Sequence, residues 1–149
     1  MQKPNFSVVA IVKNEAATLP RLVASLREFQ SLAGEIVILD TGSTDGTPDI
    51  ARKLACRVYE VGEKYMFSID GPTAEAINER FIVEEELPIV KKGDRFFDYS
   101  KARNHVASLA SNDIVFFYDA DEINVRLDIK AINKLIKEVP FHEDVIDDM

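Results

Sequence analysis

The first sixty residues alternate between apolar runs and helical patterns, and this alternation constrains the fold more than any other feature. Phe6 to Val12 is a partly β-branched run that is apolar except for Ser7, the pattern of a strand buried on both faces of a parallel sheet. Ile36 to Leu39 and Arg57 to Val61 read as two further strands. Apolar residues at helical spacing separate the three runs. The alternation predicts an α/β fold in which helices cover a mostly parallel sheet.

Both intervening helices have recognisable starts. Thr18 is the predicted N-cap of the first, with Pro20 in its first turn. Thr47 is the predicted N-cap of the second, with Pro48 at its first position. Since crossovers between parallel strands share one hand, we expect the carboxyl ends of all the strands to lie on one edge of the sheet.

The second half of the chain continues the pattern after an interruption. Ser100 to Ala110 predicts a short helix, the segment DIVFFYDADE a fourth buried strand, and Leu127 to Val139 a last helix with Ile132, Leu135 and Ile136 inward. Residues 62–98 break the rhythm, with a possible helix at Ala74 to Phe81 and an acidic run at Glu84 to Glu86. We expect an insertion at the ligand edge of the sheet, either a lid or substrate loop or a merely structural excursion.

Length, charge and cysteine content set the class of protein. The 149 residues are 46% hydrophobic, which predicts one domain, residues 1–149, with a core of its own. A formal net charge of -8 argues against nucleic acid or an anionic membrane as the main partner. The single cysteine, Cys56, favours a reducing, cytoplasmic compartment. The apolar run before Lys13 is too short for a signal peptide or a transmembrane segment.

Acidic residues gather where the predicted strands end, and ligands of open α/β sheets bind beyond those ends. Asp40 closes the second strand and is a candidate for a directional hydrogen bond to a ligand N–H. The loop Gly42 to Gly46, with Ser43 in it, allows a sharp turn beside Asp40. The alternative is that Asp40 is only a turn or cap residue and that Ser43, Thr44 and Asp45 are only turn formers. The loop lacks the lysine of a P-loop and the glutamate of an EF-hand.

The acids that close the fourth strand suggest a metal. Asp119 and Asp121, separated by Ala120, point to the same side if the segment is extended. Two carboxylates held so close favour a cation between them, and Mg²⁺ or Mn²⁺ is held by one or two carboxylates plus ligand phosphates. The alternative is a pair of solvated acids. Glu122 is expected to support the loop rather than bind the metal.

Basic and amide groups open the helix before the fourth strand. Arg103 could reach a phosphate and Asn104 could anchor backbone in the cleft, aided by the positive end of the helix. Lys101, Arg103 and Asn104 could equally be solvated surface residues. His105 has no Cys or His partner at ligand spacing, so a zinc site is not expected.

Taken together, VVAIVKNEAATLPRLVASL, EIVILDTGSTDGTPDIA and YSKARNHVASLASNDIVFFYDADE resemble the N-terminal, nucleotide-sugar-binding part of a family 2 glycosyltransferase. The resemblance implies the GT-A fold, a Rossmann-like α/β sheet with helices on both faces. It also implies an inverting glycosyltransferase that takes a nucleoside diphosphate sugar, most often UDP-linked, with Mn²⁺ or Mg²⁺.

The resemblance assigns roles to the candidate residues. Asp40 would contact the nucleotide base, and Asp119 and Asp121 would be the metal-binding DXD motif, with Ala120 between them. Val12 to Glu15, including Asn14, would line the base and ribose pocket. Arg103 and Asn104 match an arginine-asparagine pair near the donor. The catalytic residue is not identified.

The sequence departs from the family pattern in two places. The insertion at 62–98 leaves the acceptor open among a saccharide, lipopolysaccharide core or a peptide. The chain also stops soon after Asp121, where the family continues with an acceptor half and a catalytic base, so this half is expected to be absent. Alternatives are a non-catalytic nucleotide-sugar-binding module or fragment and, less favoured, a haloacid dehalogenase-type phosphatase or a nucleotidyltransferase.

Overall fold

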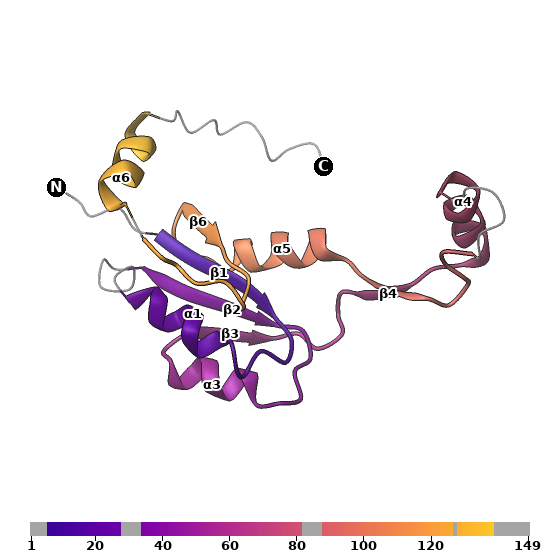
Figure 1. Cartoon of the computed structure of the whole chain (residues 1–149), viewed down its shortest axis with the longest axis horizontal. Helices are drawn as coiled ribbons and strands as arrows, with labels where there is room; N and C mark the ends of the chain where they lie inside the picture. Colours follow the sequence, from indigo (N-terminus) through magenta and orange to yellow (C-terminus); the bar gives the residue numbers. More distant parts are fainter. Residues whose placement is uncertain (1–5, 28–33, 82–87, 127, 139–149) are drawn as a thin grey trace.

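A computed structural model describes residues 6–27, 34–81, 88–126 and 128–138 (Figure 1). Its centre is a four-stranded sheet in the order β3-β2-β1-β6, in which every pair is parallel. The strands are β1 (Phe6–Val12), β2 (Glu35–Asp40), β3 (Arg57–Glu60) and β6 (Ile114–Phe117). The four apolar runs therefore form strands as predicted, and their carboxyl ends share one edge.

Helices cover both faces of the sheet (Figure 1). On one face, α1 (Leu19–Ser25) and α3 (Thr47–Lys53) pack over the alternate residues of β1 that include Val8 and Ala10. On the other face, α5 (Tyr99–Ser108) packs over Val9 and its neighbours through Ala102 and Val106. This layering confirms the predicted α/β class.

The two helix starts differ from each other. Thr18 is the N-cap of α1, but its hydroxyl donates to the Glu15 carbonyl oxygen at 3.3 Å instead of capping the helix. Thr47 was expected to cap α3, and this was wrong, because the N-cap is Gly46 and Thr47 is the first helical residue. Gly46 has φ 84°, a left-handed conformation that glycine adopts without the penalty of a Cβ atom.

The last helix is shorter than predicted. Helix α6 spans Ile129–Glu138, and Ile132 packs against the core cluster that includes Phe6 and Val8. Leu135 was expected to face inward, but it is 60% exposed. The side chain of Ile136, the acidic run 84–86 and the tail lie outside the described residues. Within those residues, no helix is long and apolar enough to cross a membrane.

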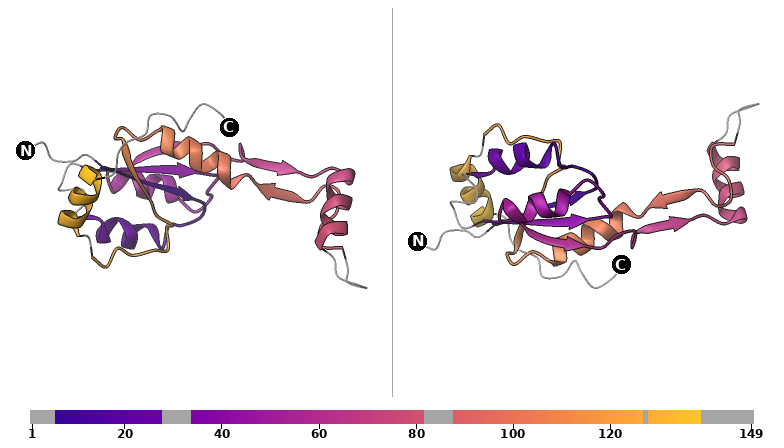
Figure 2. Two further views of the ribbon diagram at one scale, coloured as in Figure 1. Left: turned by 90° about the horizontal axis from the view of Figure 1, so that it is seen from above. Right: turned by 90° about the horizontal axis from the view of Figure 1, so that it is seen from below.

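The described part of the insertion, residues 66–81 and 88–97, forms an arm that projects from the carboxyl edge of the sheet (Figure 2). Strands β4 (Met66–Ser68) and β5 (Arg95–Phe97) pair as an antiparallel ribbon, and α4 (Gly71–Phe81) lies beyond them. The α4 end has a small core of its own, made by Ile69, Ala74, Ile77 and Val90. The insertion leaves the sheet at its carboxyl edge, and its helix begins at Gly71 rather than at the predicted Ala74. The arm extends outward instead of folding back over the sheet.

Glu35 connects the strands at the opposite, amino edge. Its carboxylate accepts hydrogen bonds from the Ser7 hydroxyl at 2.7 Å and from the Ser111 backbone N–H. Arg57 on β3 forms an ion pair with it at 2.5 Å. One carboxylate thus contacts β1, β3 and the turn that leads to β6.

Candidate functional site at the carboxyl edge of the sheet

The loops that follow β1 and β2 are held together by side chain to backbone hydrogen bonds. Asn14 has φ 58°, and its N–H donates to the Ser43 hydroxyl at 2.8 Å. In return, the Thr44 N–H donates to Asn14 Oδ1 at 2.8 Å. The Glu15 N–H donates to the Thr47 hydroxyl at 2.9 Å. The structure therefore brings Asn14, Glu15 and Ser43 together. The hydrogen bonds of Asn14 and Ser43 hold the two loops at the carboxyl edge of the sheet in contact.

Asp45 completes this connection, and sequence reasoning considered it only as a turn former. Its Oδ1 accepts from the N–H of Thr47 at 3.0 Å and from the Thr47 hydroxyl at 2.5 Å, while Oδ2 accepts from the Ala16 N–H at 3.1 Å. The hydrogen bond from the Thr47 hydroxyl is the largest influence on the pKa of Asp45 and lowers it. The spacing of Asp45 and Thr47 in an Asx-type turn was the available signal.

Asp40 uses its two carboxylate oxygens differently. Oδ1 accepts from the N–H groups of Gly42 and Ser43, each at 3.0 Å. Oδ2 is buried and has no hydrogen-bond partner among the described residues, and the residue as a whole is 2% exposed. A buried acceptor without a partner costs about 1–3 kcal/mol, so it calls for an explanation. One oxygen forms the turn, and the other is a buried acceptor that the described residues leave unused.

A cavity of about 300 Å³ opens at the carboxyl edge of the sheet, next to the end of β2, although Asp40 itself does not line it. Val12, the register partner of Asp40, and Thr41, its neighbour in the chain, both line it. The complete lining comprises Ile11, Val12, Lys13, Glu15, Thr41, Met66 and Phe97. Val12 and Glu15 were expected here. Met66 and Phe97 come from the arm, and sequence reasoning missed them because helical and strand periodicity do not reveal which face of an insertion meets the sheet.

The acidic pair lies on a turn just beyond β6. That strand ends at Phe117, which pairs with Val9, so the turn follows beside the last residues of β1. Asp119 and Asp121 are exposed, whereas Ala120 is 5% exposed and packs into the core. The expected extended geometry was wrong: the Glu122 N–H donates to the Asp119 carbonyl oxygen at 3.0 Å and closes a turn. Glu122 supports the loop as predicted, because Oε2 accepts from the Asp119 N–H at 2.9 Å.

The donor set at this turn fits a hard divalent cation held jointly with phosphate. No group of three or more His, Cys, Asp or Glu side chains arranged for a metal occurs among the described residues, so a site complete in protein ligands is not formed there. Mg²⁺ is usually bound through one or two carboxylates plus substrate phosphates, with water in its remaining positions. Asp119 and Asp121 supply that number of carboxylates and are open to solvent.

Helix α5 places a cation and a phenol beside the acidic turn. The Arg103 guanidinium lies 4.2 Å from the centroid of the Phe117 ring, at the end of β6. The Tyr99 hydroxyl donates to Asp119 Oδ1 at 3.4 Å. Partial burial and the nearby negative charge of Asp119 raise the pKa of Tyr99. Arg103 is therefore near the acidic pair, and Asn104 is exposed one residue further along the helix.

The remaining polar residues of α5 have structural partners. Asp98 is the N-cap, accepting from the Lys101 N–H at 2.9 Å and pairing with Lys101 Nζ at 2.9 Å. His105 Nδ1 forms a hydrogen bond with the Tyr65 hydroxyl at 2.5 Å. Lys101 is thus a helix-start residue rather than a free cation of the site.

Comparison with known proteins agrees with this geometry. Residues 7–69 match the family model described as glycosyl transferase family 2. A TPR repeat-containing protein of Synechococcus elongatus is 31% identical over 116 residues, which cover 78% of this chain and 20% of that protein. The 4,4'-diaponeurosporenoate glycosyltransferase of Staphylococcus haemolyticus is 39% identical over 57 residues, covering 38% of this chain and 15% of that enzyme. The chain spans one fifth or less of these two relatives.

Solved structures show the same fold. TarS of S. aureus in complex with UDP superposes with a TM-score of 0.57 at 23% identity, over 90% of this chain and 32% of that one. Glucosyl-3-phosphoglycerate synthase from Mycobacterium tuberculosis, in complex with Mn²⁺, UDP and glucosyl-3-phosphoglycerate, gives a TM-score of 0.50 at 26% identity, over 81% of this chain and 35% of that one. From the family match, the glycosyltransferase relative and the shared fold, we conclude that the chain belongs to glycosyl transferase family 2 and has a GT-A fold.

Proposed function

We propose that this chain carries the donor site of a glycosyltransferase and binds a nucleoside diphosphate sugar, with UDP as the nucleotide. The observation that carries the proposal is Asp40, which keeps one buried carboxylate oxygen without a partner among the described residues. Asp40 ends β2 at the carboxyl edge of the sheet, where its register partner Val12 and its chain neighbour Thr41 line the cavity. The imide N–H of uracil is a donor of the kind that this oxygen lacks.

The nucleoside and the diphosphate of such a ligand would each meet suitable residues at this edge of the sheet. The base and ribose would occupy the cavity next to the end of β2, where Val12 and Glu15 contribute to the lining. The diphosphate would extend toward the acidic turn after β6, near Arg103. Since the unliganded chain shields Asp40 Oδ2, binding requires a local shift of the residues around it.

Asp119 and Asp121 would hold the divalent cation, Mn²⁺ or Mg²⁺. Such a cation offsets the charge of the diphosphate and would stabilise it as a leaving group. The chain carries a net charge of -8, so a diphosphate would otherwise meet like charge at this turn. Tyr99 would hold Asp119 in place through its hydroxyl, and Glu122 would fix the backbone of the turn.

The implied reaction is inverting glycosyl transfer, in which a deprotonated acceptor attacks the anomeric carbon as the nucleotide leaves. Complexes with UDP and with Mn²⁺ among the structural neighbours support the donor side of this proposal. The acceptor stays a prediction within the group named from the sequence, a saccharide, lipopolysaccharide core or a peptide.

A thermal-shift panel tests the proposal. The chain is heated with UDP, GDP, CDP and the corresponding nucleotide sugars, with Mn²⁺ or with EDTA. A ligand present at 100 times its dissociation constant should add about 2.7 kcal/mol of stability. We expect UDP with Mn²⁺ to give the largest increase in melting temperature. Equal melting temperatures with and without every nucleotide would refute the donor-site proposal.

A further inference from the structure

The arm joins the sheet through two short segments, 62–66 and 95–99, which we call the arm root. The first segment begins against the loop that follows Asp40. Gly42, with φ 97°, faces the backbone of Gly62, and a Cβ atom added at Gly42 would lie 3.6 Å from the Gly62 Cα and carbonyl carbon. The loop that shapes Asp40 and the start of the insertion are therefore in van der Waals reach of each other.

Charged groups connect the arm root to the other loop of the site. Arg95 Nη2 pairs with Glu63 Oε2 at 2.7 Å, which joins the two root segments. The hydrogen bond from Arg95 is the largest influence on the pKa of Glu63 and lowers it, and the positive charge of Lys13 acts in the same direction. Lys13, which lines the candidate nucleotide cavity, is thus close enough to interact with the root.

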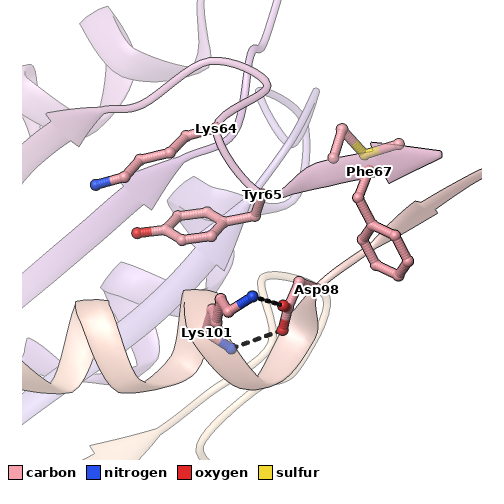
Figure 3. A pocket seen from close by; sticks show the side chains of 6 residues that line it. Lys64, Tyr65, Phe67, Asp98 and Lys101 are labelled. Carbon is pink, nitrogen blue, oxygen red and sulfur yellow. Dashed lines mark hydrogen bonds and ion pairs between the residues drawn. The ribbon is translucent and has the colours of Figure 1, made fainter.

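Aromatic side chains pack the arm root against the first turn of α5. The Phe97 ring lies edge-on to those of Tyr65 and Tyr99, with centroid distances of 6.3 and 6.0 Å. The Asp98 N–H donates to the Tyr65 carbonyl oxygen at 2.8 Å. Figure 3 shows Tyr65 between Lys64 and the first turn of α5. The Tyr99 hydroxyl in turn donates to Asp119. Phe97, which lines the cavity, therefore contacts the residue that binds the acidic turn.

Met66 and Phe97 are cross-strand partners in the ribbon, and both line the 300 Å³ cavity. We infer that the arm root is part of the donor site, with Phe97 and Met66 as the apolar wall against which the nucleobase packs. The inference rests on the proposed function and adds to it two specificity-determining residues that the insertion supplies. The planar face of a base suits an aromatic side chain and a methionine, while the edge of the base meets Asp40.

The experiment compares two ligands in Phe97→Leu and Met66→Ala. Titration calorimetry with Mn²⁺ measures the affinity for UDP and for pyrophosphate, which lacks the base. We expect either substitution to weaken UDP on the order of tenfold, the range of a lost base-stacking contact, and to leave pyrophosphate unchanged. Phe96→Leu is the matched control, because Phe96 pairs with Phe67 on the other face of the same ribbon.

The outcomes separate this inference from the proposed function. If Phe97→Leu and Met66→Ala bind UDP as tightly as the wild type while Asp40→Asn does not, the inference is wrong and the donor site stands. Equal losses for UDP and pyrophosphate would assign Phe97 and Met66 a purely structural role and overturn it as well. Failure of the wild type to bind UDP with Mn²⁺ would overturn both proposals.

Discussion

Substitution of Asp40 by asparagine isolates the one oxygen that the fold does not use. Asparagine keeps a carbonyl oxygen for the N–H groups of Gly42 and Ser43, which Asp40 Oδ1 accepts at 3.0 Å each. It replaces the unpartnered Oδ2 by an amide group that can only donate. We expect the free energy of unfolding to change by no more than about 1 kcal/mol, because one unpaired buried group replaces another.

Nucleotide affinity should respond far more strongly than stability. A hydrogen bond to a charged acceptor contributes about 1.5–3 kcal/mol, which corresponds to roughly 10- to 150-fold in affinity. Calorimetry with UDP and with pyrophosphate, both with Mn²⁺, should show this loss for UDP alone. Asp49→Asn, an equal change of charge at an exposed position of α3, is the control. A loss of equal size for both ligands, or none for UDP, would refute base recognition by Asp40.

Three further predictions concern the metal, a helix end and the amino edge. Asp121→Asn should abolish the difference in UDP affinity between Mn²⁺ and EDTA; a persistent difference would place the metal elsewhere. Ala55 follows the C-cap of α3 and has φ 61°. A side chain in this conformation costs about 1–2 kcal/mol, whereas glycine loses about 0.5–1 kcal/mol through chain entropy. Ala55→Gly should therefore raise the urea midpoint, and a lower midpoint would contradict this. Burial alone would raise the pKa of Glu35, but hydrogen bonds from Ser7, Ser111 and Arg57 lower it below its ordinary 4.5. The ionised carboxylate therefore stabilises the fold fully above that pH, and this stabilisation is lost as pH falls further. The difference in unfolding free energy between wild type and Glu35→Gln should narrow in acid. A constant difference in urea titrations from pH 6 to 3 would count against stabilisation by the ionised carboxylate.

The sheet could be predicted because its two central strands, β1 and β2, are buried on both faces. β1 is apolar except for Ser7, β2 is apolar between Glu35 and Asp40, and the alternation with helices fixes parallel pairing. The start of α3 was placed one residue late because the N-cap is Gly46, which has no capping side chain, while the Asp45 carboxylate before it accepts the Thr47 N–H. The arm escaped prediction in detail because strands of three residues, β4 and β5, are too short to show a period.

The candidate site also contains residues that could be predicted from the sequence and residues that could not. Asp40 could be selected from the sequence because its place at a strand end follows from the apolar run before it. Phe97, Met66 and Tyr99 could not, since their roles depend on contacts across the arm root and with the turn at Asp119. Residues whose position is set by tertiary packing leave no local signature in a single chain.

The strand order has a consequence for how the site assembles during folding. β1, β2 and β3 are close in sequence, whereas β6 joins β1 through a pairing of Phe6 with Ile114 that must close a long loop at an entropic cost. Local pairings form before distant ones in most small domains. The part of the cleft at the end of β2, where the nucleobase is proposed to bind, should therefore form before β6 pairs with β1. The acidic turn then comes into position with the last strand. Mn²⁺ would therefore bind the chain only after β6 has joined the sheet. The time course of Mn²⁺ binding during refolding would then report the final docking step.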